Sequence, residues 1–180
     1  MQFPTGTGIY NSERKKHKMK ISELMEKMID FSEGDQHDIC HFLKVWGYAR
    51  TIGETEGLDP ETQRILEAAA IVHDIACPLC RRKYGHADGK HQEIEGYPLA
   101  KEFLQGTGLG EQQIERVAWL VGHHHTLTGV EGMDYQILLE ADYLVNAGEQ
   151  NLSRKNIRNM YEKVFRTATG KRLLKSIYGI

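Results

Sequence analysis

Apolar residues recur at intervals of three and four positions along most of the chain, beginning at Ile21, and this interval is that of one face of an α-helix. Glycine, proline and aspartate interrupt the pattern at positions typical of helix ends. The predicted helices cover about 21–33, from Asp35 or Asp38 to 56, 60–73, 91–105, 114–125 and 135–147, with two more after Ser153 and Gly170. Residues 76–90, which contain Pro78, Gly85 and Gly89, are expected to form a loop. Because no segment alternates like a strand for long, the predicted fold class is all-α, a compact multi-helix bundle.

The composition is that of a globular protein with one domain. The chain has 180 residues, of which 40% are apolar and 27% charged, and a domain of this size buries roughly 70% of the surface of its unfolded chain. The net charge of −2 gives no reason to expect a nucleic-acid polymer or an anionic membrane as a partner. No apolar run approaches the roughly 20 residues of a membrane span, and no signal peptide is visible. Cys40, Cys77 and Cys80 make no disulfide framework, so a cytoplasmic location is expected.

The polarity of the chain changes near its beginning. Residues 1–18 end in a run of charged side chains and are expected to form a flexible arm. Residues 19–180 are expected to form the domain, with core motifs within 37–148 and C-terminal helices within 152–180. The apolar stripe of these last helices is expected to cover the core, and a face between copies in a homo-oligomer is the alternative.

The apolar run from Ala68 to Ile75 contains an adjacent histidine and aspartate, His73 and Asp74. A buried pair of this kind is costly unless something compensates it, and a divalent cation does so because both side chains are metal ligands. Two adjacent residues cannot complete a coordination sphere, so further ligands are expected from other helices.

His41 and Asp142 are the candidate partners. Each lies on the apolar stripe of its own predicted helix, and a lone carboxylate on such a stripe binds a cation or takes up a proton. A satisfied core histidine at His41, and a salt bridge or a helix cap at Asp142, are the alternatives. The predicted metal ligands are therefore His41, His73, Asp74 and Asp142, and the ion could be Mn, Mg, Fe, Ni, Co or Zn.

The order His41, His73-Asp74, Asp142 resembles the HD superfamily of metal-dependent phosphohydrolases. The flanks carry the same resemblance: residues 38–45 look like its first-histidine helix, 68–75 like its Ala-Ala-x-x-His-Asp-Ile element, and 139–144 like its Ala-Asp-x-Leu element. The resemblance covers about residues 20–150. It implies an all-helical HD domain, a divalent metal, and hydrolysis of phosphate esters, often of nucleotides, by metal-activated water.

Some members of this superfamily bind a second metal through a histidine four residues before a helix glycine and a histidine or histidine pair on the next helix. In this chain Gln92 stands four residues before Gly96, and His91 is out of step by one. The triplet 123–125 could supply the other half, so a second metal is an open alternative.

The candidate catalytic residues are Asp74, His124 and His123. Asp74 is already engaged as a ligand, so a histidine of the triplet is the better proton carrier. His124 is preferred because it continues the apolar stripe of its helix, and His123 follows it. A helix C-terminal cap, where cations favour the negative end of the dipole, is the alternative for the triplet.

Three cations, Arg81, Arg82 and Lys83, follow the metal motif and are candidate ligands for substrate phosphate, with solvated surface as the alternative. The predicted function is a phosphohydrolase acting on a small-molecule phosphate ester, of a nucleotide or a related compound. A nucleotide-sensing HD module without activity is one alternative. A di-iron oxygenase of HD-like fold is another, but it needs two metals bridged by Asp74, and Gln92 counts against it.

Overall fold

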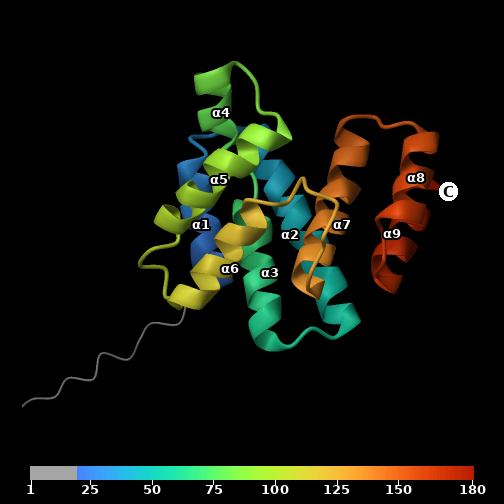
Figure 1. Ribbon diagram of the computed structural model, residues 1–180, viewed down its shortest axis with the longest axis horizontal. Coiled ribbons are helices and arrows are strands. Elements are labelled where there is room, and N and C mark those ends of the chain that lie inside the picture. Colours follow the sequence, from blue (N-terminus) through green and yellow to red (C-terminus); the bar gives the residue numbers. More distant parts are fainter. Residues whose placement is uncertain (1–19) are drawn as a thin grey trace, which may run out of the picture.

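The structure, a computed structural model, describes residues 20–180, and every regular element in this part of the chain is a helix. The all-α prediction is thus confirmed, whereas the predicted arm over 1–18 lies outside the described residues. Figure 1 shows the helices stacked side by side, with both ends of the described chain on the outside. Their bounds are α1 (Ile21–Phe31), α2 (Gln36–Glu56), α3 (Pro60–Val72), α4 (Cys77–Tyr84), α5 (Gly89–Phe103), α6 (Glu111–Val121), α7 (Met133–Glu149), α8 (Arg154–Lys163) and α9 (Ala168–Tyr178).

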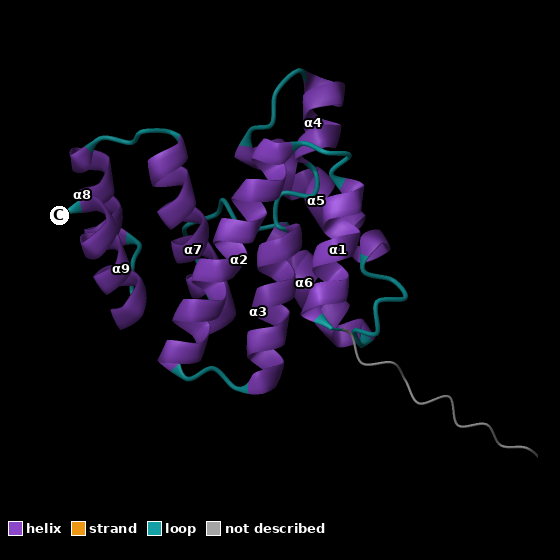
Figure 2. Ribbon diagram, turned by 180° about the vertical axis from the view of Figure 1, so that it is seen from behind, coloured by secondary structure: helices purple, strands orange, loops and turns teal. Residues whose placement is uncertain are grey.

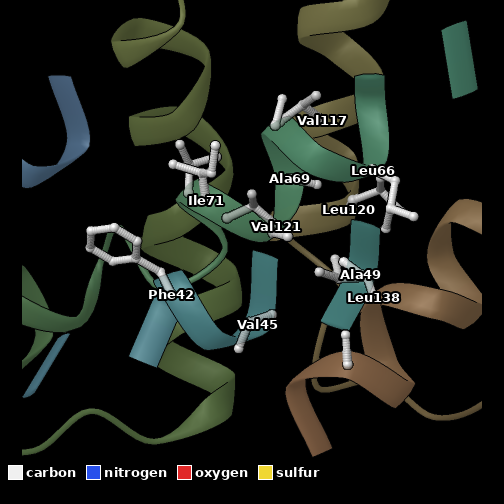
Figure 3. Packing of buried hydrophobic residues seen from close by; sticks show 14 of the residues in the cluster. Phe42, Val45, Ala49, Leu66, Ala69, Ile71, Val117, Leu120, Val121 and Leu138 are labelled. Carbon is white, nitrogen blue, oxygen red and sulfur yellow. The ribbon is translucent and has the colours of Figure 1, made fainter. Parts of the chain in front are cut away.

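Helix α3 is the centre of the bundle, because it packs against α1, α2, α6 and α7. Its last five residues, 68–72, are fully buried, and three of them are alanines, which let the neighbouring helices approach closely. Figure 3 shows the side chains that meet around this helix: Phe42, Val45 and Ala49 from α2, Leu66, Ala69 and Ile71 from α3, Val117, Leu120 and Val121 from α6, and Leu138 from α7. Since α3 is covered on several sides, whatever follows its last turn also lies inside the protein.

Helix starts follow the local chemistry of the sequence. Asp35, Asp59 and Asp88 each accept hydrogen bonds from backbone N–H groups in the first turn of α2, α3 and α5, respectively. Gly57 ends α2 in the left-handed conformation, with φ of 77°. Among the described helices, none combines the length and apolar composition that a membrane crossing requires.

The prediction of a loop over residues 76–90 is wrong in its first half, where the chain forms α4. Pro78 stands in the first turn of that helix, where a missing N–H costs no hydrogen bond. Gly85 ends the helix with φ of 80°. The two residues that indicated a loop are therefore the start and stop of a short helix, which Figure 1 shows projecting from one end of the bundle.

The C-terminal helices α8 and α9 form the outer layer beside α7 and α2, as Figures 1 and 2 both show. They are held by Glu140, a fully buried residue of α7. Its carboxylate accepts hydrogen bonds from the backbone N–H of Arg166 at 2.6 Å, the backbone N–H of Thr167 at 3.0 Å and Nε2 of Gln136 at 2.7 Å. It also accepts from Oγ1 of Thr167. One buried carboxylate thus fixes the segment between α8 and α9 against α7.

Candidate metal centre

Four polar side chains from neighbouring helices converge inside the bundle. His41 comes from α2, His73 and Asp74 directly follow α3, and Asp142 comes from α7. Nε2 of His41 lies 3.1 Å from Nε2 of His73 and 3.2 Å from Oδ1 of Asp142. Oδ2 of Asp74 lies 3.4 Å from the same His41 atom and 3.5 Å from Nε2 of His73. The four predicted ligands therefore direct one atom each toward a common point.

This spacing fits a metal ion. Ligand atoms at roughly 2.1 Å from an ion lie roughly 3.0–3.4 Å from one another in octahedral or tetrahedral geometry, close to the distances just given. Two imidazoles and two carboxylates are also a donor set that first-row divalent ions accept. His41, His73 and Asp142 are all buried, so the donors are shielded from water. The described part of the chain thus contains a group that could hold a divalent cation.

The tautomer of His73 is set by the helix that precedes it. Its side chain is fully buried, and Nδ1 lies 2.9 Å from the carbonyl oxygen of Ala70. A carbonyl oxygen only accepts, so Nδ1 carries the proton and donates it. The lone pair of the neutral ring is then on Nε2, which faces the common point. A backbone carbonyl at the end of α3 orients this ligand.

Two residues that the sequence analysis missed orient the other ligands. Nδ1 of His41 lies 2.8 Å from Oε2 of Glu149, whose other oxygen accepts from Lys44 at 2.9 Å. Nδ2 of Asn146 donates to Oδ1 of Asp142 at 2.7 Å. Asp142, Asn146 and Glu149 follow one another at intervals of four and three residues on α7, so they share one face of the helix. That spacing is the sequence signal that could have revealed them.

Within the triplet, His124 lies beside this group and His123 does not. His124 is buried, its Nδ1 lies 2.7 Å from the carbonyl oxygen of Val121, and its Nε2 lies 3.3 Å from Oδ1 of Asp74. That Nε2 atom has no hydrogen-bond partner among the described residues. His123 instead stacks on Trp119, with 4.1 Å between ring centres, and its Nδ1 pairs with the Trp119 carbonyl. The structure thus brings His124, and not His123, next to Asp74.

Asp74 is shared between two groups of candidate ligands. Oδ2 faces His41 and His73, whereas Asp74 also belongs to a second group with His124 and His125, whose ligand atoms lie within 4.8 Å of one another. Gln92 takes part indirectly, because its Oε1 lies 2.8 Å from Nε2 of His125. The unpartnered Nε2 of His124 is the kind of buried atom that an ion would satisfy. A second ion therefore has candidate ligands, although Gln92 replaces the expected histidine.

The electrostatics of the group require positive charge. Burial raises the pKa of Asp74, but the neighbouring histidines outweigh burial and hold it well below its usual range. Burial likewise raises the pKa of Asp142, and hydrogen bonds with His41 and His73 outweigh this and lower it. Both carboxylates are therefore ionised at neutral pH, in a place where unpaired negative charge is costly. A bound cation would compensate them.

A cavity of about 500 Å³ opens beside the ligands, between them and α8. Its wall is formed by Asp74, Ala87, Gly89, Gln92, His124, His125, Leu127, Leu139, Asp142, Tyr143, Asn146, Gln150, Leu152, Asn156 and Met160. Because two candidate ligands form part of this wall, a small molecule in the cavity would lie next to a bound ion.

The three cations predicted to bind phosphate lie on α4 and do not line this cavity. Arg81 pairs with Asp35 at 3.3 Å and also with Asp38. Lys83 pairs with Glu95 at 2.7 Å, and Arg82 lines a separate hollow between α1 and α4. Their role as phosphate ligands stays a prediction.

Comparison with known families identifies the fold. A family model of the HD domain matches residues 38–159, which is more than half of the chain. The chain belongs to the HD domain family, as the order His41, His73-Asp74, Asp142 predicted. Among curated proteins, no significant match is found.

Solved structures show the same fold. A predicted HD superfamily hydrolase from an uncultured Thermotogales bacterium is similar over 92% of this chain and 88% of its own, with a TM-score of 0.65 and 21% identity. The Lin1889 protein of Listeria innocua is similar over 87% of this chain and 88% of its own, with a TM-score of 0.55 and 16% identity. At these identities the likeness establishes the architecture alone.

Glu149→Gln is expected to weaken metal binding by roughly 10- to 100-fold without unfolding the protein, because the variant loses the charged partner that orients His41 and makes its ring more basic. Calorimetric titration with Mn²⁺ measures the change. Glu162→Gln, an exposed glutamate of α8, is the matched control and should bind as the wild type does. Equal affinity in all three proteins would show that Glu149 does not position the ligand.

Proposed function

We propose that this protein is a metal-dependent phosphohydrolase that cleaves a phosphate ester of a nucleotide or a related small molecule. The observation that carries the proposal is the convergence of His41, His73, Asp74 and Asp142 beside a cavity of about 500 Å³. A buried group of imidazoles and carboxylates next to a cavity large enough for a small substrate suits hydrolysis at a metal site.

The residues have separate tasks in this proposal. His41, His73, Asp74 and Asp142 would hold a divalent ion, which supplies the positive charge that activates water and polarises the phosphoryl oxygen. Glu149 and Asn146 orient His41 and Asp142, so that little reorganisation is needed when the ion binds. The ligands therefore come from elements that are already packed in place.

His124 is the residue best placed to move a proton. Its Nδ1 donates to the Val121 carbonyl, so Nε2 of the neutral ring can accept a proton on the side of Asp74. The same atom could instead hold a second ion together with Asp74 and His125. Metal stoichiometry separates the two tasks: loss of one of two equivalents in His124→Ala indicates a ligand, and an unchanged single equivalent indicates a proton carrier.

The direct test of the proposal is hydrolysis of a panel of phosphate esters, including p-nitrophenyl phosphate, by the purified protein with Mn²⁺, Mg²⁺, Fe²⁺, Ni²⁺, Co²⁺ or Zn²⁺. We expect turnover that chelation abolishes and that the variant His73→Ala/Asp74→Ala lacks. Turnover that survives both treatments would come from another site or from a contaminant. Binding of nucleotides without turnover of any ester would favour the alternative of a sensing module.

One observation favours a second candidate, a di-iron oxygenase. The two oxygens of Asp74 face different histidine sets, as a carboxylate that bridges two ions would. Iron content near two equivalents and an optical absorption that changes on exposure to oxygen would support this candidate over hydrolysis.

Metal affinity is expected to fall as the pH is lowered. Burial lowers the pKa of His41, but its hydrogen bond to Asp142 and the charges of Asp74 and Asp142 outweigh burial and raise it to about 9. Below that pH the ring of the metal-free protein is protonated, and an ion must displace the proton to bind. The affinity should therefore drop about tenfold for each pH unit below about 9, with one proton released per ion.

Calorimetry in buffers of different ionisation enthalpy, from about pH 6.5 to about pH 8.5, measures the proton release. Glu149→Gln should release less, because the variant lacks one of the groups that raise the pKa of His41. An affinity that does not change across this range would contradict the assignment of a protonated His41 to the metal-free state.

A further inference from the structure

We propose that the cavity selects a monoester with one phosphate group on a neutral, hydrogen-bonding body, and that it discriminates against di- and triphosphates. This inference rests on the proposed function, because it assigns the substrate class of the same site.

The formally charged side chains that line the cavity are carboxylates. Asp74 and Asp142 line the cavity, and among the described residues no lysine or arginine does. Two carboxylates balance one divalent ion, so the site has no surplus charge for a phosphate chain. A second ion beside His124 would leave a surplus of two positive charges, which one phosphate dianion neutralises. In either case a further phosphate in the cavity would have no lysine or arginine of the described wall to compensate its charge.

The wall offers neutral hydrogen-bonding groups in place of cations. The hydroxyl of Tyr143 donates to Oδ1 of Asn156 at 2.6 Å. Nδ2 of Asn156 has no partner among the described residues. Gln150 donates to Asn146 at 3.0 Å, and no described group occupies its Oε1. One free donor and one free acceptor therefore remain for an uncharged substrate body.

Apolar side chains complete the same wall, namely Leu127, Leu139, Leu152 and Met160. A cavity of apolar side chains with a few neutral polar groups fits a body that has both an apolar face and hydrogen-bonding edges. A nucleoside has both features, whereas a simple sugar has few apolar atoms. A comparison of adenosine monophosphate with ribose 5-phosphate therefore tests whether the body is a nucleoside or a simple sugar.

Two cations of α8 are the main alternative, because they line a hollow that adjoins the cavity. Lys155 and Arg158 line a hollow of about 680 Å³ that shares only Asn156 with the cavity. A phosphate chain that left the cavity past Asn156 would meet them. In that case triphosphates would bind well, and the test must separate this outcome from the proposed one.

The experiment compares adenosine mono-, di- and triphosphate, which share one body and differ in phosphate number, with ion in excess of all ligand. We expect kcat/KM to fall by at least about tenfold from the monophosphate to the triphosphate, the difference expected from one uncompensated charged contact. The shift in melting temperature caused by each ligand gives the same ranking without turnover. Hydrolysis of any ester of the panel, p-nitrophenyl phosphate included, shows separately whether the proposed function holds.

A variant that adds a cation tests the cause of the selectivity. Met160→Lys places a positive charge on the cavity wall and should raise the ratio of triphosphate to monophosphate kcat/KM by about tenfold. Asn159→Lys adds the same charge on α8 at an exposed residue that does not line the cavity, and its ratio should match the wild type.

The proposal is overturned, with the proposed function intact, if the wild type uses or binds the triphosphate as well as or better than the monophosphate. If that behaviour disappears in Lys155→Ala/Arg158→Ala, the phosphate chain lies on α8. If no ester of the panel is hydrolysed, the proposed function fails, and the melting temperatures still decide the charge selectivity.

Discussion

Replacing Asp142 with alanine is expected to abolish turnover and to weaken metal binding by more than about 100-fold, since even an outer-shell partner contributes roughly 10- to 100-fold. Asp142 supplies one of the two carboxylates of the candidate metal centre, and its Oδ1 lies 3.2 Å from Nε2 of His41. The helices should remain folded, because α7 buries its own apolar side chains such as Leu138 and its Glu140 binds the segment before α9. Metal content after purification, beside turnover and far-ultraviolet circular dichroism, measures all three effects.

The control for this variant is Asp30→Ala, the same change at an exposed aspartate of α1. It should keep the metal and the activity. The double variant His73→Ala/Asp74→Ala should lose the metal as Asp142→Ala does, and the wild type should retain one equivalent or more. Full metal content in Asp142→Ala would show that Asp142 of α7 is not a metal ligand. Activity retained without metal would contradict the proposal of metal-dependent hydrolysis.

Glu140→Ala is expected to lower the free energy of unfolding by more than about 3 kcal/mol. The change leaves the backbone N–H groups of Arg166 and Thr167 and the hydroxyl of Thr167 without their acceptor, and each unpaired buried group costs roughly 1–3 kcal/mol. Urea unfolding followed by circular dichroism measures the difference. Because the lost contacts hold the segment between α8 and α9, the cavity wall on α8 should also loosen.

Glu162→Ala, an exposed glutamate of α8, should change stability by less than about 0.5 kcal/mol. Gly170→Ala provides an independent check, since a Cβ at this position would lie 1.9 Å from Oε2 of Glu140 and must displace it. If Glu140→Ala and Gly170→Ala both unfold at the wild-type urea concentration, the carboxylate does not anchor the C-terminal helices.

The four ligands that lie together in the structure could be predicted because each of them has a strong local signal in the sequence. An imidazole or a carboxylate on an apolar helical stripe is costly unless it has a partner, so its position in the sequence already indicates a site. The same reasoning could have found Glu149 and Asn146, which share the stripe of Asp142 on α7. Both are only half-buried, and a polar residue at the edge of a stripe looks like ordinary surface.

Other features depend on contacts between helices. His123 and His124 are adjacent in the sequence, yet one stacks on Trp119 and the other faces Asp74, because α6 ends at Val121 and the next residues turn. The segment after the metal motif was expected to be a loop because Pro78 and Gly85 interrupt it. In the structure they begin and end α4, since a proline in the first turn and a glycine past the last are compatible with a helix.

The sequence by itself determined the helical class, most helix boundaries, the HD family and the four candidate ligands, because these depend on periodicity, capping and the cost of burying polar groups. Tertiary structure alone decided which ligand atoms meet, that Asp74 faces two histidine sets, and that neutral side chains from α7 and α8 line the cavity. These features arise where helices far apart in the chain pack together, and local patterns do not encode which side chains those contacts bring face to face.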